Sequence, residues 1–78
     1  MNLGKSLEDY LETILMLQKK KGYVRSVDVA TYMNFSKPSV CHAVKELRKK
    51  GYLTMDTDGS LRLTEQGIKL AQQVYERH

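Results

Sequence analysis

Cysteine is scarce in this chain of 78 residues, and long apolar runs are absent. The single cysteine, Cys41, excludes an internal disulfide and is compatible with a reducing cytoplasm. No apolar stretch approaches the roughly 20 residues that a membrane-spanning helix needs. The first residues contain no secretory apolar region, and Gly4 is misplaced for N-myristoylation. We therefore expect a cytoplasmic protein without a membrane partner. Because repeats and linkers are also lacking, we expect residues 1–78 to form one small domain.

Positive charge is concentrated in the middle of the chain. The formal net charge is +4, from 13 basic and 9 acidic side chains. Residues 1–21 carry four bases and three acids, residues 22–50 carry six and two, and residues 51–78 carry three and four. The middle segment thus holds the whole net excess, which favours an anionic partner.

The hydrophobic pattern predicts four helices and one β-hairpin. Apolar residues recur with the period of a helix before Gly51, and two short strand-like runs follow it. The two runs flank Asp58-Gly59, the pair that a type I′ hairpin turn prefers. The predicted helices are 6–21, 27–33, 36–50 and 65–78, and the predicted strands are 52–55 and 61–63.

Four hydroxyl side chains are expected to cap these helices, because each can accept a hydrogen bond from a backbone N–H of the first turn. They are Ser6, Ser26, Ser36 and Thr64. In the second helix we expect Val27, Ala30 and either Tyr32 or Met33 to face the core. The last helix has a broader apolar arc than a small core needs, so Leu70 and Val74 are expected to be exposed if a partner domain is missing.

Segment 36–50, SKPSVCHAVKELRKK, is the most informative part of the chain. At 100° per residue, its apolar side chains fall on one side of a helix and most of its polar ones fall on the other. The inward set is Val40, Ala43, Val44 and Leu47, and the opposite set is Pro38, His42, Lys45 and Lys49. This pattern predicts a DNA-reading helix, in which His42 hydrogen-bonds a base edge and Pro38 packs against a thymine methyl group. Lys37, Lys45 and Lys49 are expected to bind phosphates.

The order helix, helix, turn, helix, hairpin, helix is that of a winged helix-turn-helix, a mainly α fold with a small β-hairpin. In that architecture the third helix enters the major groove of DNA, and the hairpin, called the wing, lies along the backbone or minor groove. Arg62, in the second strand of the predicted wing, is therefore counted among the expected DNA contacts.

Five segments resemble the metal-dependent repressors related to the diphtheria toxin repressor, most closely the manganese-responsive branch. They are SLEDYLETI, GYVRSVDVA, SKPSVCHAVKEL, GYL and LTEQGIKLAQQVYERH, and together they cover almost the whole chain. The resemblance implies a metal-dependent transcriptional repressor that binds a double-stranded DNA operator as a homodimer. Neither catalysis nor a small-molecule substrate is expected.

The same resemblance assigns roles to individual residues. Asp9, Glu12 and His78 match family ligands of a divalent metal, Mn²⁺ with Fe²⁺ as the alternative, and an oxygen ligand at Asp9 favours manganese. The positions assigned to base contact are Ser36, Pro38, Ser39, Cys41 and His42. The family's other ligands and its dimerisation domain have no counterpart in the sequence. We therefore expect a DNA-binding module whose own metal site is weak or absent.

Other interpretations remain open at this stage. Asp9 also fits a capping box with Ser6, in which it supports the helix and binds no metal. The fold also occurs as a protein-interaction module and in regulators that respond to other ligands. An enzyme is the weakest hypothesis, because the chain contains no nucleophile–base pair and no phosphate-binding loop.

Overall fold

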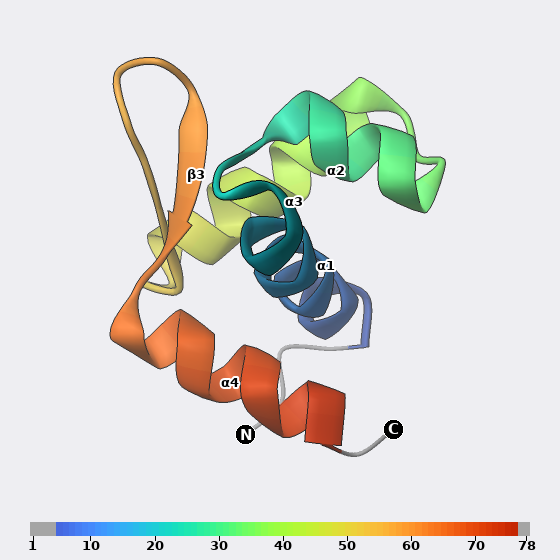
Figure 1. Cartoon of the computed structure of the whole chain (residues 1–78). Helices are drawn as coiled ribbons and strands as arrows, with labels where there is room; N and C mark the ends of the chain where they lie inside the picture. Colours follow the sequence, from blue (N-terminus) through green and yellow to red (C-terminus); the bar gives the residue numbers. More distant parts are fainter. Residues whose placement is uncertain (1–4, 77–78) are drawn as a thin grey trace.

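A computed structural model describes residues 5–76 of the chain (Figure 1). Four helices and three short strands follow one another along the sequence. They are α1 (Lys5–Lys21), β1 (Val24–Arg25), α2 (Ser26–Met33), α3 (Lys37–Lys49), β2 (Leu53–Met55), β3 (Ser60–Leu63) and α4 (Glu65–Glu76). The order confirms the predicted winged helix-turn-helix.

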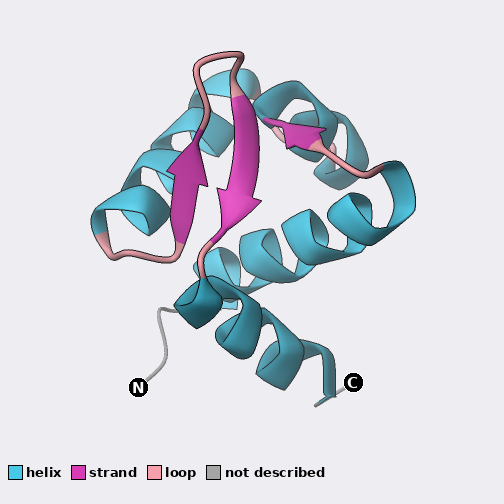
Figure 2. Ribbon diagram, turned by 60° about the vertical axis from the view of Figure 1, so that its left-hand side comes forward, coloured by secondary structure: helices cyan, strands magenta, loops and turns pink. Residues whose placement is uncertain are grey.

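The helices surround α1, and the sheet closes one side of the molecule. In Figure 1, α2 and α3 lie on one side of α1 and α4 lies on the other, and α4 packs along α1. The strands form one antiparallel sheet in the order β1-β3-β2 (Figure 2). The large fully buried side chains come from α1, β1, α2, α3 and β3, and α4 adds Ala71, so one core joins the helices to the sheet. The largest are Leu11, Ile14, Leu47, Leu61, Val24, Val29 and Val40.

The start of α2 differs from the prediction. Val24 and Arg25 pair with β3 as a third strand that the sequence pattern did not reveal, because two residues are too few to show a period. The helix consequently begins at Ser26, and Arg25 is its N-cap residue, so the predicted Ser26 cap is wrong. The backbone N–H of Arg25 donates to Asp28 Oδ2 at 2.9 Å. Of the predicted core residues, Ala30 is buried and Met33 is half-buried, but Val27 is 47% and Tyr32 55% exposed.

The hairpin turn also differs from the predicted type I′ turn. A type I′ turn needs a positive φ at both central residues, whereas Gly59 is the only residue of the loop with a positive φ, at 88°. The N–H of Gly59 donates to the carbonyl of Asp56 at 2.9 Å, and the N–H of Asp56 donates to Ser60 at 2.9 Å. This is the pattern of a type I turn followed by a glycine bulge, in which Asp58 stays in its favoured backbone region.

Helix α4 begins as predicted, but its apolar face is more buried than expected. Thr64 Oγ1 accepts from the N–H of Gly67 at 3.1 Å, which confirms the predicted cap. Val74 is 4% exposed and Leu70 is half-buried, so the expectation that both are exposed is wrong for Val74. The exposed apolar residue at this end is Tyr75, at 60%.

Candidate nucleic-acid interface

Helix α3 starts at the predicted cap. Ser36 Oγ accepts from the N–H of Ser39 at 3.3 Å and donates to the Ser39 hydroxyl at 2.9 Å. Pro38 lies in the first turn, where a missing N–H removes no intrahelical hydrogen bond. At the other end, Gly51 takes a φ of 87°, a backbone conformation that glycine adopts without strain.

The two faces of α3 are separated as the sequence predicted. Val40, Ala43, Val44 and Leu47 are buried in the core. The exposed residues of the helix are Lys37, Pro38, Ser39, Cys41, His42, Lys45, Arg48 and Lys49. We call this surface the α3 face. It contains every residue that the sequence assigned to DNA contact within the helix, and the lone thiol of Cys41 lies on it as well.

A hollow of about 560 Å³ lies between the C-terminal half of α3 and strand β2. Three cations line it, together with three side chains of the strand: Lys45, Arg48, Lys49, Leu53, Thr54 and Met55. Three cations around one concave surface suit a phosphate group. Sequence reasoning did not place Thr54 or Met55 in the site, because the packing of α3 against β2 leaves no local pattern.

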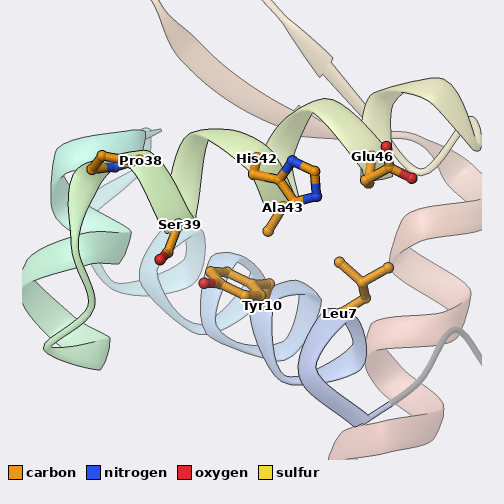
Figure 3. Close-up of a pocket in the computed structure, with 7 residues that line it drawn as sticks. All are labelled: Leu7, Tyr10, Pro38, Ser39, His42, Ala43 and Glu46. Carbon is orange, nitrogen blue, oxygen red and sulfur yellow. The ribbon is translucent and has the colours of Figure 1, made fainter.

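A second hollow of about 560 Å³ lies on the other side of α3, toward α1. Figure 3 shows Leu7 and the ring of Tyr10 on α1 facing Ala43 and His42 on α3. Glu46, the only acid of α3, lines this hollow and not the basic one. The acid of the helix is thus segregated from the cations that face β2.

Tyr10 lies between α1 and the helix-turn-helix. Its side chain is 5% exposed, and burial raises the pKa of its hydroxyl above the ordinary value. Its ring lies 5.8 Å from that of Phe35, which belongs to the turn between α2 and α3. Tyr10 therefore ties α1 to the helix-turn-helix and limits movement of the N-terminal half of α3.

The wing places Arg62 on β3, the central strand of the sheet, where it lines a small hollow with Gln18, Gly22 and Tyr23. The Nε–H of Arg62 donates to Asp56 Oδ2 at 2.8 Å, and the side chain is 72% exposed. Arg62 is paired with Thr54 of β2, which lines the basic hollow. At the tip of the wing, the hydroxyl and N–H of Ser60 donate to Asp58 and hold the pKa of that carboxyl below its ordinary value.

The candidate metal ligands are only partly placed. Asp9 and Glu12 lie three residues apart on α1 and are both half-buried, whereas His78 lies outside the described residues. Within residues 5–76, no three His, Cys, Asp or Glu side chains come close enough to hold a metal ion. The predicted cap by the Ser6 hydroxyl, and with it the capping box of Asp9, lies outside the side chains that the structure describes.

A smaller hollow of about 260 Å³ is lined by residues of both α1 and α4. Its lining residues are Glu12, Leu15, Met16, Lys19, Lys20, Gln72 and Tyr75. Glu12 thus lies on the same concave surface as Tyr75, in the last described turn of α4. Two carboxylates of one helix supply hard oxygen donors of the kind that Mn²⁺ accepts, but the described residues alone do not complete a site.

Residues 2–61 match the family of the N-terminal DNA-binding domain of iron-dependent repressors. The chain belongs to this family. As a member, it is a DNA-binding domain of the type found in metal-dependent transcriptional regulators.

Individual relatives agree with this assignment. The chain is 38% identical over 73 residues to the HTH-type transcriptional regulator MntR of Lysinibacillus sphaericus, and the match covers 94% of this chain and 52% of that protein. For MntR of Shouchella clausii the identity is 40% over 73 residues, with 94% and 51% covered. The chain therefore spans about half the length of these relatives.

Solved structures confirm the fold. T. acidophilum IdeR superimposes with a TM-score of 0.87 at 27% identity, over 100% of this chain and 36% of that one. S. aureus MepR, solved in complex with DNA, gives a TM-score of 0.72 at 20% identity over 96% and 58%, which shows a shared fold alone. Among the described residues, no helix is long and apolar enough to cross a membrane.

Proposed function

We propose that this domain reads a double-stranded DNA operator by inserting α3 into the major groove. The α3 face carries this proposal, because it gathers four bases and a histidine on the side of the helix opposite its buried stripe. A solvated face without a nucleic-acid partner more often mixes acids with bases, and the one acid of α3 faces α1 instead. The basic face also argues against a pure protein-interaction module.

The proposed contacts divide by their chemistry. The N-terminal part of the helix supplies the candidates for base contact, which are Ser36, Pro38, Ser39, Cys41 and His42. Lys37, Lys45, Lys49 and the wing residue Arg62 are proposed to bind phosphates, which set the position of the helix without reading sequence. Arg48 joins this second group, because it lines the same hollow as Lys45 and Lys49.

We further propose that the domain serves a manganese-responsive repressor, with Fe²⁺ as the alternative metal. The relatives named MntR and the two carboxylates Asp9 and Glu12 support manganese. We propose that His78 and residues of a second domain complete the site and that the second domain forms the homodimer. When bound, the ion would join α1 to that domain. Such a regulator would act in the cytoplasm and occupy a pseudo-palindromic operator.

The single domain is expected to bind DNA weakly. One reading helix without a dimer partner should show a dissociation constant on the order of 10⁻⁴–10⁻⁶ M at physiological salt, mostly from phosphate contacts. Its affinity should fall steeply with salt, by about 0.9 in log K per unit of log salt for each phosphate neutralised.

Selection from a randomised duplex pool, with and without Mn²⁺, tests the proposal. Enrichment of one half-site motif in both conditions would support a reading head whose metal switch requires residues beyond the domain. A motif that appears only with Mn²⁺ would mean that Asp9, Glu12 and His78 form a working site by themselves. No enrichment and no salt-dependent binding in either condition would refute DNA recognition by this domain.

His42→Ala sharpens the assignment of base contact. We expect the variant to lose about 1–3 kcal/mol of discrimination at one position of the selected motif, because a side chain that hydrogen-bonds a base edge is removed. The salt slope should stay unchanged, since no phosphate contact is lost. Lys45→Ala is the matched control and should weaken all sequences equally. Equal weakening of all sequences by His42→Ala would show that His42 does not read bases.

A further inference from the structure

The wing carries two acids, Asp56 and Asp58, although it adjoins the proposed DNA surface. Asp58 has a role within the loop, because Ser60 donates to it through its N–H at 3.0 Å and its hydroxyl at 2.6 Å. Asp56 receives the Ser60 hydroxyl only at 3.5 Å. Its short contact is with Arg62, whose Nε–H donates to it at 2.8 Å.

This ion pair is built in a way that leaves the arginine able to bind a second anion. The contact uses Nε, so the two terminal nitrogens of the guanidinium, with four N–H groups, are not engaged by it. The arginine side chain is 72% exposed and the aspartate 43% exposed. An ion pair this exposed contributes little to folding stability. Its main physical effect is to restrict the orientation of a flexible cation, which reduces the entropy lost when that cation binds a ligand.

The position of Arg62 indicates which ligand this is. Arg62 is the β-ladder partner of Thr54, and paired residues project from the same face of a sheet. Thr54 lines the basic hollow together with Lys45 and Lys49 of α3. Neighbouring strands lie about 4.8 Å apart, so Arg62 stands one strand beyond this hollow. Arg62 also lines a hollow with Gly22 and Tyr23 on the β1 side of β3. It therefore extends positive charge from α3 across the wing, whose loop projects from the molecule in Figure 1.

We propose that Asp56 is a positioning residue: it holds the guanidinium of Arg62 so that the terminal nitrogens face a DNA phosphate. This inference rests on the proposed function, because it requires the wing to lie against DNA. It assigns a favourable effect on DNA binding to an acidic residue, the opposite of what its charge alone would produce.

The direction in which Asp56→Ala changes DNA affinity tests the inference. Binding of the chain to a random-sequence 30-base-pair duplex is measured by fluorescence anisotropy over a series of salt concentrations. Removal of an acid near DNA should by itself tighten binding. We expect Asp56→Ala to weaken binding instead, by about two- to fourfold at low salt, and to make the salt slope shallower. Arg62→Ala should weaken it by about five- to tenfold and lower the slope by about 0.9.

Two matched variants separate positioning from charge. Asp58→Asn removes the same charge from the same wing without touching the Arg62 contact, and it should tighten binding by up to about twofold. In an Arg62→Ala background, Asp56→Ala should also tighten binding, because no guanidinium remains to be positioned. If Asp56→Ala alone tightens binding as Asp58→Asn does, Asp56 is only a repelling charge and the proposal is wrong.

The remaining outcomes separate this inference from the proposed function. If Arg62→Ala leaves affinity and slope unchanged, Arg62 binds no phosphate and the inference fails. The effect of Lys45→Ala on affinity still tests independently whether α3 binds DNA. Thermal melting of each variant shows whether the fold is intact. If Asp56→Ala does not fold, Asp56→Leu keeps the approximate size of the side chain and removes both its charge and its acceptor, and its affinity should again fall and not rise.

Discussion

Helices α3 and α4 have nearly the same length and construction but opposite surface chemistry. Each is amphipathic and each is capped by a hydroxyl, from Ser36 in α3 and Thr64 in α4. The sequence of α3 contains four bases and one acid, whereas that of α4 contains one base and two acids. An apolar stripe thus explains why both helices belong to the fold. Only the exposed side distinguishes a candidate DNA-reading helix from one that packs the domain together.

The buried sides of the two helices differ as well. Helix α3 fills the core mainly with branched side chains such as Leu47, whereas α4 buries two small residues, Gly67 and Ala71, beside Val74. A Cβ atom at Gly67 would lie 2.1 Å from the carbonyl oxygen of Tyr52, which is closer than any real contact. The packing of α3 therefore relies on large side chains, whereas the close packing of α4 requires that Gly67 have no side chain.

The largest expected effect is on the buried side of α3. Leu47→Ala should lower the free energy of unfolding by about 2–5 kcal/mol, because a fully buried side chain leaves a cavity in the core. Urea denaturation followed by circular dichroism measures the loss. Arg48→Ala, at the exposed neighbouring position, should change stability by no more than about 0.5 kcal/mol. Similar values for the two variants would contradict the described orientation of α3.

The corresponding test of α4 uses an added methyl group. Gly67→Ala should destabilise the domain by about 1–3 kcal/mol, because the backbone of Tyr52 must move to make room. Helix propensity alone predicts the opposite sign, a gain of about 1 kcal/mol. Chemical denaturation distinguishes the two, with the exposed Gln72→Ala in the same helix as the control. A stabilised Gly67→Ala variant would mean that α4 lies farther from the strand connection than described.

Removal of single positive charges from α3 and from α4 compares the contributions of their exposed sides to DNA binding. Lys45→Gln and Lys49→Gln should each lower the salt slope of DNA binding by about 0.9, because each lysine is proposed to neutralise one phosphate. Lys69→Gln removes the single base of α4 and should leave the slope unchanged. Binding to a generic duplex is measured by anisotropy at several salt concentrations. An equal loss for Lys69→Gln would show that the domain binds DNA through its overall charge and not through α3.

The smallest expected effect concerns α2, in whose first turn the carboxylate of Asp28 accepts a backbone hydrogen bond. A hydrogen bond from Lys21 and one from the backbone of Arg25 hold the pKa of Asp28 below its ordinary value. Because the folded-state pKa is the lower one, the stabilisation is present above the unfolded pKa of about 3.9 and is lost as pH falls through the folded value.

Thermal melting at pH 7 and at low pH measures this effect. Asp28→Asn should cost up to about 1 kcal/mol at pH 7, and the difference from the native chain should vanish at low pH. Ser36→Ala, which removes the hydroxyl cap of α3, should instead cost about the same at both pH values. A pH-independent loss for Asp28→Asn would show that its charge contributes nothing.

Sequence periodicity predicted α3 more accurately than α2. The cap, the buried stripe and the exposed set of α3 all agree with the pattern, because thirteen residues contain more than three helical turns. Helix α2 has only eight residues, and its start depends on the pairing of Val24 and Arg25 with β3. That pairing joins residues more than 30 positions apart, so nothing near Ser26 in the sequence indicates it. The exposed side of α2 was accordingly misassigned at Val27.

The site shows the same division between local and distant information. Each cation of the α3 face could be assigned from its position in the helix, but the hollow that Lys45, Arg48 and Lys49 share with Thr54 could not. The family resemblance assigned Asp9 and Glu12 to a metal, whereas the relation of Glu12 to α4 appears only in the structure, where Glu12 and Tyr75 line one surface. The contact of Arg62 with Asp56 likewise depends on the type I turn and bulge that replaced the expected type I′ turn.

The amino-acid sequence by itself determined the amphipathic helices, the caps of α3 and α4, and the concentration of positive charge on α3. These features follow from interactions within a few turns of one helix, where spacing along the chain is spacing in three dimensions. Tertiary structure alone decided the third strand, the close approach at Gly67, the basic hollow and the orientation of Arg62. Each of these features arises from contact between segments far apart in the sequence, and the residues near each position do not indicate which distant segment they will contact.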